Sequence, residues 1–443
     1  MKFLISLVST LVVFFVASSF FTMQHSILLA LVFLLVILWT NEALPLGVVS
    51  LLPIILFPSF DILSTNETVS NYSKSIIFLF LGGFMIAVAT QKTELHKYIA
   101  KKLLSIFPKT ARGILFSLAV TSAFLSSLLS NTTTALLLIP IAIFLTNDSN
   151  LKMRFVLAIA YGSSIGGIVT PIGTPPNLIL LGFLEEHSIE AIPFISWMVY
   201  TSPLAILMLL IIPFVLSIGV KNFELEKGFD DVMVLNSDQK RLLLILLGLV
   251  ILLLVNSKIE PYYSGLGLNE KGILLGFGLL MFLPKFGFLT WDDTKKIPYE
   301  IIFLFGAGFS IANAVSSTGL AQEIASNLLS LTNLPVFLMI LIIAAMITFT
   351  TEITSNTALI SIALPIIYSL GQAANLDLTL VLFVATICAS YAFMLPIATP
   401  PNAIAMSSKV VKVKDMAKYG FVFNILGISL ITIIALVFWQ HFI

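Results

Sequence analysis

Long apolar runs separated by short polar segments occupy most of this chain. A helix of about 20 apolar residues crosses the roughly 30 Å hydrocarbon core of a bilayer, so runs of this kind predict transmembrane helices. The pattern therefore predicts an all-α polytopic membrane protein with about 11 transmembrane helices. The predicted spans are 3–22, 26–40, 44–60, 76–92, 155–183, 197–219, 242–256, 271–284, 300–316, 378–407 and 420–441.

Two further apolar stretches, at about 113–145 and 335–370, contain prolines and clusters of polar residues in their middle. Each predicts a re-entrant hairpin that enters and leaves the membrane by the same face. The composition agrees with a membrane protein, because 58% of the residues are hydrophobic and only 10% are charged. The net charge of +1 indicates no nucleic-acid partner, and the single cysteine, Cys388, cannot form an internal disulfide.

The distribution of basic residues predicts the orientation in the membrane. If Lys2 lies in the cytoplasm and the spans alternate, only Lys74, Lys258 and Lys271 of the 23 Lys and Arg residues fall outside. This arrangement satisfies the positive-inside rule, and it predicts a cytoplasmic N-terminus and an external C-terminus. Residues 1–25 are predicted to form an N-terminal helix, with a cleaved signal peptide as the alternative.

The second half of the chain repeats the first at a constant offset of 225 in the numbering, the offset that takes Asn131 to Asn356. The segment "FLFLGGFMIAVATQKTELHKYIAKKLL" at 78–104 aligns with "FLFGAGFSIANAVSSTGLAQEIASNLL" at 303–329. Because an odd number of spans separates equivalent points, the two halves are predicted to form an inverted-topology repeat, which is typical of transporters. The predicted domains are 26–219, with its hairpin at about 113–145 and a broken helix at 155–183; a cytoplasmic linker at 220–241; and 242–443, with its hairpin at about 335–370 and a broken helix at 378–407.

Each half contains two places where a helix is predicted to break. One is a Ser-Asn-Thr cluster at the hairpin tip, and the other is a Thr-Pro-Pro-Asn run. Proline removes a backbone donor and clashes with the preceding turn, so two in a row interrupt a helix. The carbonyl groups freed at such a break can bind a small cation, and the amide groups at the next helix start can bind an anion.

The spacing of these clusters favours a binding site. A single polar cluster in a membrane helix is usually a helix-packing contact. Here the separation along the chain from Asn131 to Asn177 equals the separation from Asn356 to Asn402. Helix packing gives no reason to keep that spacing in both halves, whereas one site built by both halves does.

With these motifs the chain resembles the divalent anion–sodium symporter (DASS) family of dicarboxylate transporters. The resemblance is carried by "NEALPLGVVSLLPIILFP" at 41–58, by the paired Ser-Asn-Thr motifs, and by the segments "IGTPPN" and "CASYAFMLPIATPPNAI". It implies a homodimer in which each protomer has a scaffold domain and a transport domain that moves by elevator-type alternating access. It also implies Na⁺ as the coupling ion and a small dicarboxylate as the substrate.

The resemblance implies which residues form the site. The substrate carboxylates would be contacted by Ser130, Asn131, Thr132, Ser355, Asn356 and Thr357, helped by Thr174 and Thr399. One Na⁺ site would use Ser126, Ser130, Asn131 and Gly173. The other Na⁺ site would use Thr351, Thr354, Asn356 and Ala398, with Pro400 beside it. The implied pairs, such as Ser126 with Thr351, obey the offset that the repeat shows independently.

Neither motif contains Lys or Arg, so a dianion would be held by amides, hydroxyls, helix ends and bound Na⁺. Because unpaired charge inside a membrane is costly, we expect Na⁺ to complete the site before the dicarboxylate binds. The inverted repeat favours a secondary transporter over an enzyme or a channel. Exchange of one dicarboxylate for another, and arsenite- or proton-coupled transport on a similar architecture, stay open. Glu352 beside the second motif could tune cation binding, carry a proton or make a structural hydrogen bond.

Overall fold

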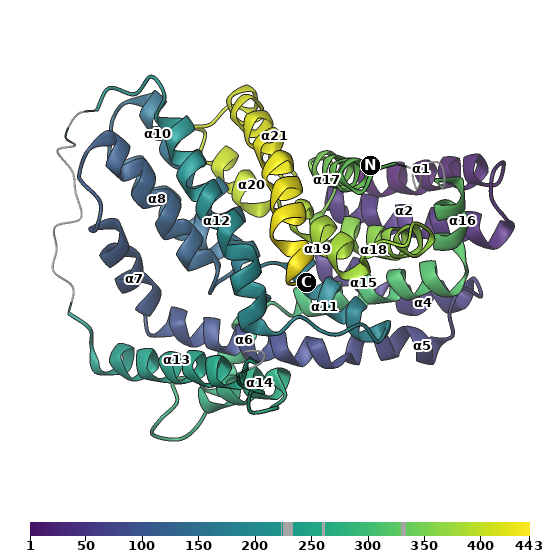
Figure 1. The fold of residues 1–443 in the computed structure, drawn as a ribbon, viewed down its shortest axis with the longest axis horizontal. Coiled ribbons are helices and arrows are strands. Elements are labelled where there is room, and N and C mark those ends of the chain that lie inside the picture. Colours follow the sequence, from purple (N-terminus) through teal and green to yellow (C-terminus); the bar gives the residue numbers. More distant parts are fainter. Residues whose placement is uncertain (223, 225–233, 259–261, 329–333) are drawn as a thin grey trace.

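The computed structural model describes residues 1–222, 224, 234–258, 262–328 and 334–443, and the regular elements of this part of the chain are helices (Figure 1). The helices of the first half are α1 (Lys2–Ala17), α2 (Met23–Asn41), α3 (Leu46–Leu51), α4 (Pro53–Ser59), α5 (Thr65–Ser70), α6 (Ser75–Lys92), α7 (Leu95–Leu104), α8 (Ala111–Ser126), α9 (Asn131–Phe144), α10 (Ser149–Val169), α11 (Pro175–Glu186) and α12 (Phe194–Ser217). Those of the second half are α13 (Ser237–Asn256), α14 (Glu270–Leu280), α15 (Tyr299–Ser317), α16 (Leu320–Asn327), α17 (Val336–Thr351), α18 (Asn356–Ala373), α19 (Leu378–Ala389), α20 (Pro400–Ser407) and α21 (Val413–Val437).

Six helical segments in the described part of the chain are long and apolar enough to cross a membrane. Six shorter apolar segments, of 10 to 17 residues, accompany them and include both arms of the first hairpin. The predicted all-α polytopic fold is confirmed. Fewer than 11 segments reach full length. Some predicted spans consist of two shorter helices, as 44–60 does with α3 and α4, and others hold one short helix, as 271–284 does with α14.

The helix boundaries repeat with the offset found in the sequence. Helices α8 and α17 begin and end at equivalent positions, and α9 and α18 begin at Asn131 and Asn356. Helices α11 and α20 begin at Pro175 and Pro400. Both predicted hairpins are therefore present, with tips at residues 127–130 and 352–355.

The prolines begin the second part of each broken helix. Pro175 and Pro176 occupy the first turn of α11, and Pro400 and Pro401 occupy the first turn of α20. Proline is tolerated there because the first N–H groups of a helix have no intrahelical partner. The break itself precedes the prolines, at 170–174 in the first half and at 390–399 in the second.

Helix α10 lies at the centre of the main hydrophobic core. It packs against α8, α9, α12 and α20, and almost all of its residues after Met153 are buried. Tyr161 and Phe155 on this helix are fully buried, and the Tyr161 ring makes edge-to-face contacts with Phe393 and Phe423 of the second half. The helix that leads into the first break is therefore held rigidly by both halves.

The two halves exchange contacts at their breaks. Helix α9, from the first hairpin, packs against α20 of the second half, and α18, from the second hairpin, packs against α11 of the first half. Each hairpin helix is thus a neighbour of the broken helix that belongs to the other repeat.

Helices α6 and α14 approach each other closely through their backbones. A side-chain carbon at Gly82 on α6 would lie 2.4 Å from the Leu274 carbonyl oxygen on α14, and one at Gly278 would lie 2.7 Å from Gly82 Cα. Glycine at both positions allows α6 and α14 to touch through their backbones. The equivalent helix pair in the other half, α15 and α3, is also packed together.

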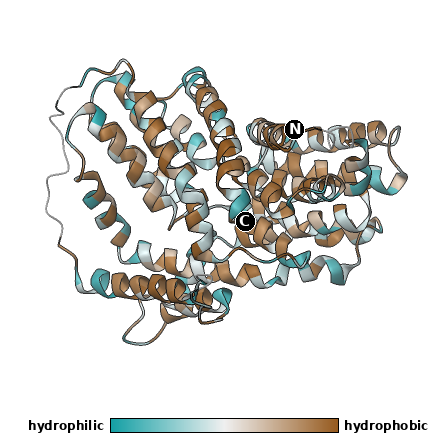
Figure 2. Cartoon of the chain, in the orientation of Figure 1, coloured by the Kyte–Doolittle hydropathy of each residue, from teal (hydrophilic) through white to brown (hydrophobic). Residues whose placement is uncertain are grey.

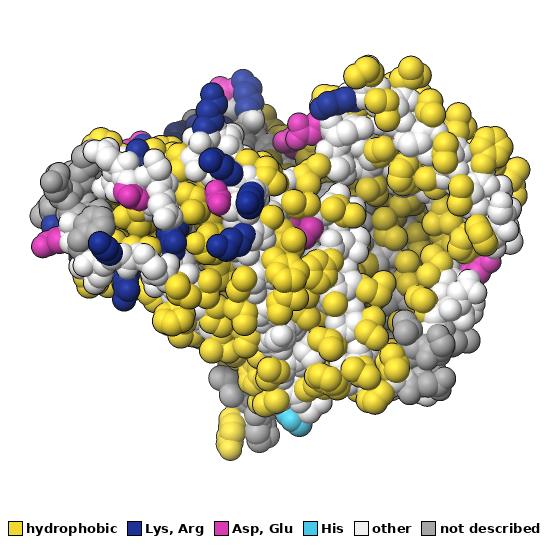
Figure 3. Space-filling model, turned by 90° about the horizontal axis from the view of Figure 1, so that it is seen from above, with side chains coloured by type: hydrophobic (Ala, Val, Ile, Leu, Met, Phe, Trp, Pro, Cys, Tyr) yellow, Lys and Arg dark blue, Asp and Glu magenta, His cyan; other side chains and the backbone are white. Residues whose placement is uncertain are grey.

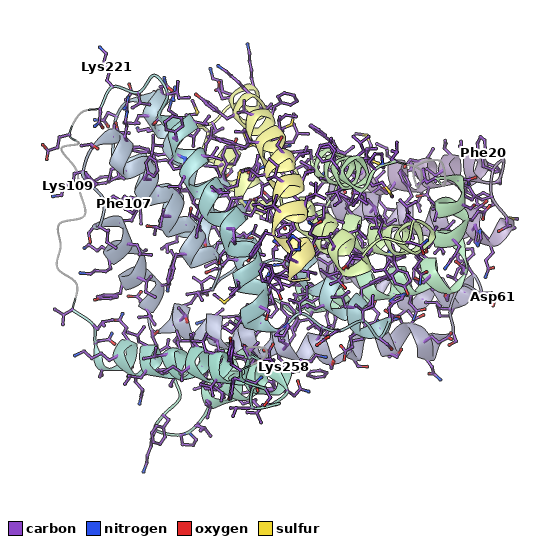
Figure 4. All side chains as sticks on the ribbon, in the orientation of Figure 1. Phe20, Asp61, Phe107, Lys109, Lys221 and Lys258 are labelled. Carbon is purple, nitrogen blue, oxygen red and sulfur yellow. The ribbon has the colours of Figure 1, made fainter. Side chains whose placement is uncertain are left out.

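Some residues that the topology prediction assigns to opposite sides lie at opposite ends of the molecule. Figure 4 shows Lys109 and Lys221, both predicted inside, at one end, and Phe20 and Asp61, both predicted outside, at the opposite end, whereas Lys258, also predicted outside, lies between them. Helices α7 and α16 occupy equivalent positions in the two repeats and lie at opposite ends of the molecule (Figure 1). Inverted halves produce this arrangement.

Two of the three lysines predicted outside meet acidic partners that the same topology places outside. Lys74 Nζ lies 2.6 Å from Glu186 Oε2, and Lys271 Nζ lies 2.7 Å from Glu185 Oε1. Ser75 also donates to the Glu185 carboxylate, at 2.9 Å. These contacts join the first turns of α6 and α14 to the C-terminal end of α11.

The surface suits a lipid environment. Hydrophobic residues cover most helices of both halves (Figure 2), and large apolar side chains such as Leu244, Leu247 and Ile251 on α13 are exposed. In the view of Figure 3, Lys and Arg side chains gather over one part of the face, beside broad hydrophobic areas. Apolar areas of this extent are uncommon on soluble monomers.

Candidate functional site at the hairpin tips and helix breaks

The tip of the first hairpin brings a hydroxyl against an asparagine. Helix α8 ends at Ser126, and α9 begins at Asn131. The Ser126 hydroxyl donates to Asn131 Oδ1 at 2.5 Å, and Ser130 caps α9 by accepting from the backbone N–H of Thr133 at 3.2 Å. Ser126 is fully buried, so this pair of oxygens lies inside the protein.

The second hairpin builds the same contact. The Thr351 hydroxyl lies 2.7 Å from Asn356 Oδ1 and 2.9 Å from the Ala389 carbonyl oxygen. Thr351 and Asn356 are the repeat counterparts of Ser126 and Asn131. The two predicted Na⁺ sites thus share one local geometry, in which a buried hydroxyl contacts the amide oxygen of the first residue of a helix.

The helix breaks are also built alike. In the first half, the Thr170 carbonyl accepts from the backbone N–H of Gly173 at 3.2 Å and from Asn177 Nδ2 at 2.9 Å. Asn177 Nδ2 lies 3.1 Å from the Gly167 carbonyl as well. One asparagine amide therefore ties the end of α10 to the turn that precedes α11.

In the second half, the Leu395 carbonyl accepts from the backbone N–H of Ala398 at 3.3 Å and from Asn402 Nδ2 at 3.0 Å. Asn402 Nδ2 lies 3.0 Å from the Ala392 carbonyl. Each of these partners stands at the repeat offset from its counterpart in the first half. The hydrogen-bond pattern has been kept even where the side chains differ.

The first hairpin tip and the first break touch each other. A side-chain carbon at Gly167 would lie 2.8 Å from Asn131 Oδ1 and 3.0 Å from its Nδ2, and one at Gly173 would lie 2.4 Å from the Gly167 carbonyl oxygen. The absence of side chains at these two glycines allows the Asn131 amide, the end of α10 and the turn at Gly173 to stack on one another.

A small pocket opens beside this first set of residues. Ser130, Gly173 and Pro175 line it from the hairpin and the broken helix, and Phe80 and Phe305 line it from α6 and α15. None of the second set of predicted residues lines this pocket. Among the described residues, the packing of α9 and α10 on α20 and of α11 on α18 and α19 joins the two sets.

Four of the predicted threonines lie at the starts of four helices. Thr132 is half-buried on α9, and Thr357 is buried on α18. Thr174 and Thr399 are the buried N-cap residues of α11 and α20. The Thr399 hydroxyl accepts from the Asn402 backbone N–H at 3.4 Å, whereas the Thr174 side chain makes no capping bond.

Three further predicted residues lie around the second tip and break. Ser355 is the N-cap residue of α18 and makes no side-chain capping bond. The Thr354 hydroxyl donates to the Thr350 carbonyl at 3.2 Å, so it is turned back along α17. Pro400 is exposed at the start of α20.

The Glu352 carboxylate holds the second break in place. One oxygen accepts from the backbone N–H groups of Phe393 at 2.7 Å and Met394 at 2.9 Å, and from Asn424 Nδ2 at 2.6 Å. The other oxygen accepts from the Leu395 backbone N–H at 3.0 Å. The side chain is buried. Of the three interpretations from sequence, this geometry supports the structural hydrogen bond.

The site chemistry is that of neutral oxygens and helix starts. In the part of the chain that the structure describes, no group of three or more His, Cys, Asp or Glu side chains could hold a metal ion. The hydroxyl and amide oxygens at the two tips are hard ligands, which suit an alkali cation. The N–H groups at the starts of α9 and α18 suit an anion.

Paired hairpins, paired breaks and a repeated hydrogen-bond pattern place the protein among the inverted-repeat membrane proteins. Residues 33–388 match the sequence profile of a family described as citrate transporter, CitMHS. The chain therefore belongs to the citrate transporter family, in agreement with its resemblance to the divalent anion–sodium symporters.

Individual relatives agree with this membership. A protein named sodium-dependent dicarboxylate transporter SdcS from Staphylococcus saprophyticus subsp. saprophyticus is 30% identical over 428 residues, which cover 89% of this chain and 82% of that protein. The SdcS protein of Staphylococcus aureus is 31% identical over 434 residues, which cover 90% of this chain and 83% of that protein.

A solved structure, that of the Alcanivorax borkumensis YdaH transporter, whose topology is described as unusual, shares the fold. The TM-score is 0.55, and the match covers 82% of this chain and 86% of that chain. Sequence identity is 13%, so this likeness concerns the fold alone.

Sequence reasoning did not place three structurally central asparagines among the site residues. Asn177 and Asn402 belong to the quoted motifs, and the signal for their role is that both occur at the same offset. Asn424, which contacts Glu352, gives no such signal, because its counterpart in the first half is Val199.

Proposed function

We propose that this protein is a secondary active transporter that carries dicarboxylates of the succinate, malate and fumarate class across the membrane together with Na⁺. The observation that supports this most directly is the duplicated pair of a buried hydroxyl and a helix-starting asparagine, Ser126 with Asn131 and Thr351 with Asn356. The similarity to the sodium-dependent dicarboxylate transporter SdcS of Staphylococcus aureus supports the same ion and substrate class.

Each hydroxyl–asparagine pair would form one side of a Na⁺ site. In the first half the Gly173 carbonyl and the Ser130 hydroxyl would complete the oxygen ligands, and in the second half the Ala398 carbonyl and Thr354 would do so. Na⁺ is a hard cation that prefers oxygen ligands, and every atom proposed as a ligand in these two sets is an oxygen. Thr354 would have to turn from its present hydrogen bond to the Thr350 carbonyl to take part.

The bound cations would supply the positive charge that the substrate needs. None of the described residues that line the pocket at Ser130 is Lys or Arg. A dianion there would therefore rely on Na⁺, on hydroxyls such as those of Thr132 and Thr357, and on the N–H groups of the helix starts. Cation binding before substrate binding is the simplest coupling that follows.

The proposal extends to the arrangement of the protein. It comprises elevator-type alternating access in a homodimer, with the repeats at 26–219 and 242–443. The N-terminus is cytoplasmic and the C-terminus is outside. The uneven distribution of Lys and Arg along the chain, with 20 of the 23 on the side assigned to the cytoplasm, supports this topology.

The test is uptake of labelled succinate into proteoliposomes. We expect an inward Na⁺ gradient to drive accumulation, and replacement of Na⁺ by choline to abolish it. Equal uptake in choline would refute the coupling. A second set of vesicles loaded with unlabelled dicarboxylate separates symport from exchange, because an exchanger accumulates label there without a Na⁺ gradient.

Two substitutions test the site within this assay. Asn131→Ala and Asn356→Ala each remove an amide oxygen from one cation site, and loss of a hydrogen bond or ligand to a charged group costs about 1.5–3 kcal/mol. We expect each variant to lose uptake by about tenfold or more. The matched control is Asn147→Ala, since Asn147 is exposed in the loop after α9. Normal transport in either site variant would contradict the site.

A further inference from the structure

Asn177 and Asn402 share an unusual hydrogen-bonding state. Both side chains are fully buried, and each Nδ2 donates to two backbone carbonyls in or just before the preceding break. Neither Oδ1 atom has a hydrogen-bond partner in the part of the chain that the structure describes. An unpartnered buried oxygen lowers stability, so stability alone does not explain an asparagine at these two positions. The hydrogen bonds that each side chain makes in the fold come from its Nδ2 group.

The carbonyls that these amides contact belong to the turns that present the cation ligands. The Thr170 carbonyl receives both Asn177 Nδ2 and the backbone N–H of Gly173. The Leu395 carbonyl receives both Asn402 Nδ2 and the backbone N–H of Ala398. Each asparagine thus closes the turn whose last residue is the proposed carbonyl ligand of one Na⁺ site.

The second backbone carbonyl that Asn177 contacts connects the first break to the hairpin tip. Asn177 Nδ2 contacts the Gly167 carbonyl, and Gly167 lies directly against the Asn131 amide. In the second half the corresponding contact is to Ala392. The next residue, Phe393, donates its backbone N–H to Glu352 of the second hairpin tip. The asparagine of each break is therefore bonded at or next to a residue that the hairpin tip of the same half contacts.

We infer that Asn177 and Asn402 are positioning residues, one for each Na⁺ site, which hold the carbonyl-bearing turn in register with the hydroxyl–asparagine pair of the hairpin. The inference rests on the proposed function. An asparagine suits this role because a single small side chain offers two N–H donors from one nitrogen. Aspartate has nearly the same shape but would turn an acceptor oxygen toward the two carbonyls.

The test compares Asn177→Asp and Asn402→Asp with the wild-type transporter in proteoliposomes. We expect the Na⁺ concentration for half-maximal succinate uptake to rise about tenfold or more in each variant, as expected when buried acceptors lose their donors. At saturating Na⁺ the KM for succinate should return close to the wild-type value. A variant that is only damaged in folding instead loses transport capacity at every Na⁺ concentration.

A binding measurement that does not need transport accompanies the uptake assay. Na⁺ raises the unfolding temperature of a protein that it binds in the folded state. We expect the Na⁺ concentration that produces half of this shift to increase in both variants of the purified protein. The matched control is Asn256→Asp, because Asn256 is a buried asparagine that holds Leu268 by two hydrogen bonds far along the chain from either break. The Na⁺ dependence of this control should match the wild type.

Three outcomes are distinguishable. If the wild-type protein shows neither Na⁺-driven uptake nor Na⁺-dependent stabilisation, the proposed function fails. If the wild type shows both and either Asp variant keeps its Na⁺ dependence, the positioning role is refuted. If an Asp variant cannot be purified as a monodisperse protein, Asn177→Gln and Asn402→Gln take its place, since glutamine keeps both N–H groups but displaces them by one methylene. An unchanged Na⁺ dependence in these variants also refutes the role.

Discussion

Replacement of Gly173 by alanine adds one methyl group at the turn of the first helix break. Its carbon would lie 2.4 Å from the Gly167 carbonyl oxygen and 3.0 Å from the Gly167 carbonyl carbon. Both neighbours are backbone atoms at the end of α10, which is buried among helices of both halves. Neither can move aside as a flexible side chain would, so the turn itself has to shift.

The cost of such overpacking is typically about 1–3 kcal/mol. If the shift displaces the Gly173 carbonyl from the proposed first Na⁺ site, the loss falls on cation affinity, and it corresponds to about a 5- to 150-fold higher Na⁺ requirement. The second half makes this prediction a specific one. Alanine is the natural residue at the equivalent position, Ala398. The residue there that corresponds to Gly167 is Ala392.

The assay is Na⁺-dependent succinate uptake in proteoliposomes, with Na⁺ varied at fixed substrate. Gly173→Ala should shift the Na⁺ dependence, whereas Ala398→Gly, which removes a methyl group, should shift it far less. Gly276→Ala is the matched control, because a side-chain carbon at Gly276 on α14 meets no atom within 4 Å. Wild-type Na⁺ dependence in Gly173→Ala would refute the argument that close stacking at this turn forms the cation site.

Two further predictions concern charged groups. Glu352→Gln replaces an acceptor oxygen by an amide group that faces N–H donors, so it should destabilise the protein by about 1–3 kcal/mol, measured as a lower unfolding temperature in detergent. The control Glu300→Gln, at an exposed position, should leave the unfolding temperature unchanged. Equal unfolding temperatures for Glu352→Gln and wild type would contradict the structural role of Glu352. At Glu185, burial raises the pKa, but the hydrogen bonds from Lys271 and Ser75 outweigh it and hold the pKa below its ordinary value. The stabilisation is therefore present above the ordinary carboxyl pKa and is lost as the pH falls through the lowered value. The unfolding-temperature difference between wild type and Lys271→Met should accordingly shrink from pH 7 towards pH 4, and a difference that does not change with pH would contradict the pairing.

Much of the local structure follows from the sequence for direct reasons. Apolar runs predict membrane helices because a bilayer core leaves no water to hydrogen-bond an open backbone. The Ser-Asn-Thr clusters predict hairpin tips, and the tips lie there, with α9 and α18 beginning at the asparagines. The Pro-Pro pairs predict interrupted helices, although the structure places the prolines at the start of the second part of each broken helix.

The repeat supplied information that single motifs could not. Its constant offset, read from the sequence, correctly pairs Ser126 with Thr351 and Gly167 with Ala392 in equivalent hydrogen bonds and contacts. The offset could not reveal Asn424, because its hydrogen bond to Glu352 has no counterpart in the first half.

The chain alone determined its helices, their breaks and the pairing of its two halves, because these depend on hydrophobic length, on proline and on residue spacing, all of which are local properties. Only the tertiary structure decided that the hairpin of each half packs on the broken helix of the other, and that Lys271 reaches Glu185. It also decided that two asparagine amides close the turns of the breaks. These contacts join residues that are far apart in the sequence. A pattern along the chain does not specify which helix faces will pack together or which backbone carbonyl a side chain will reach.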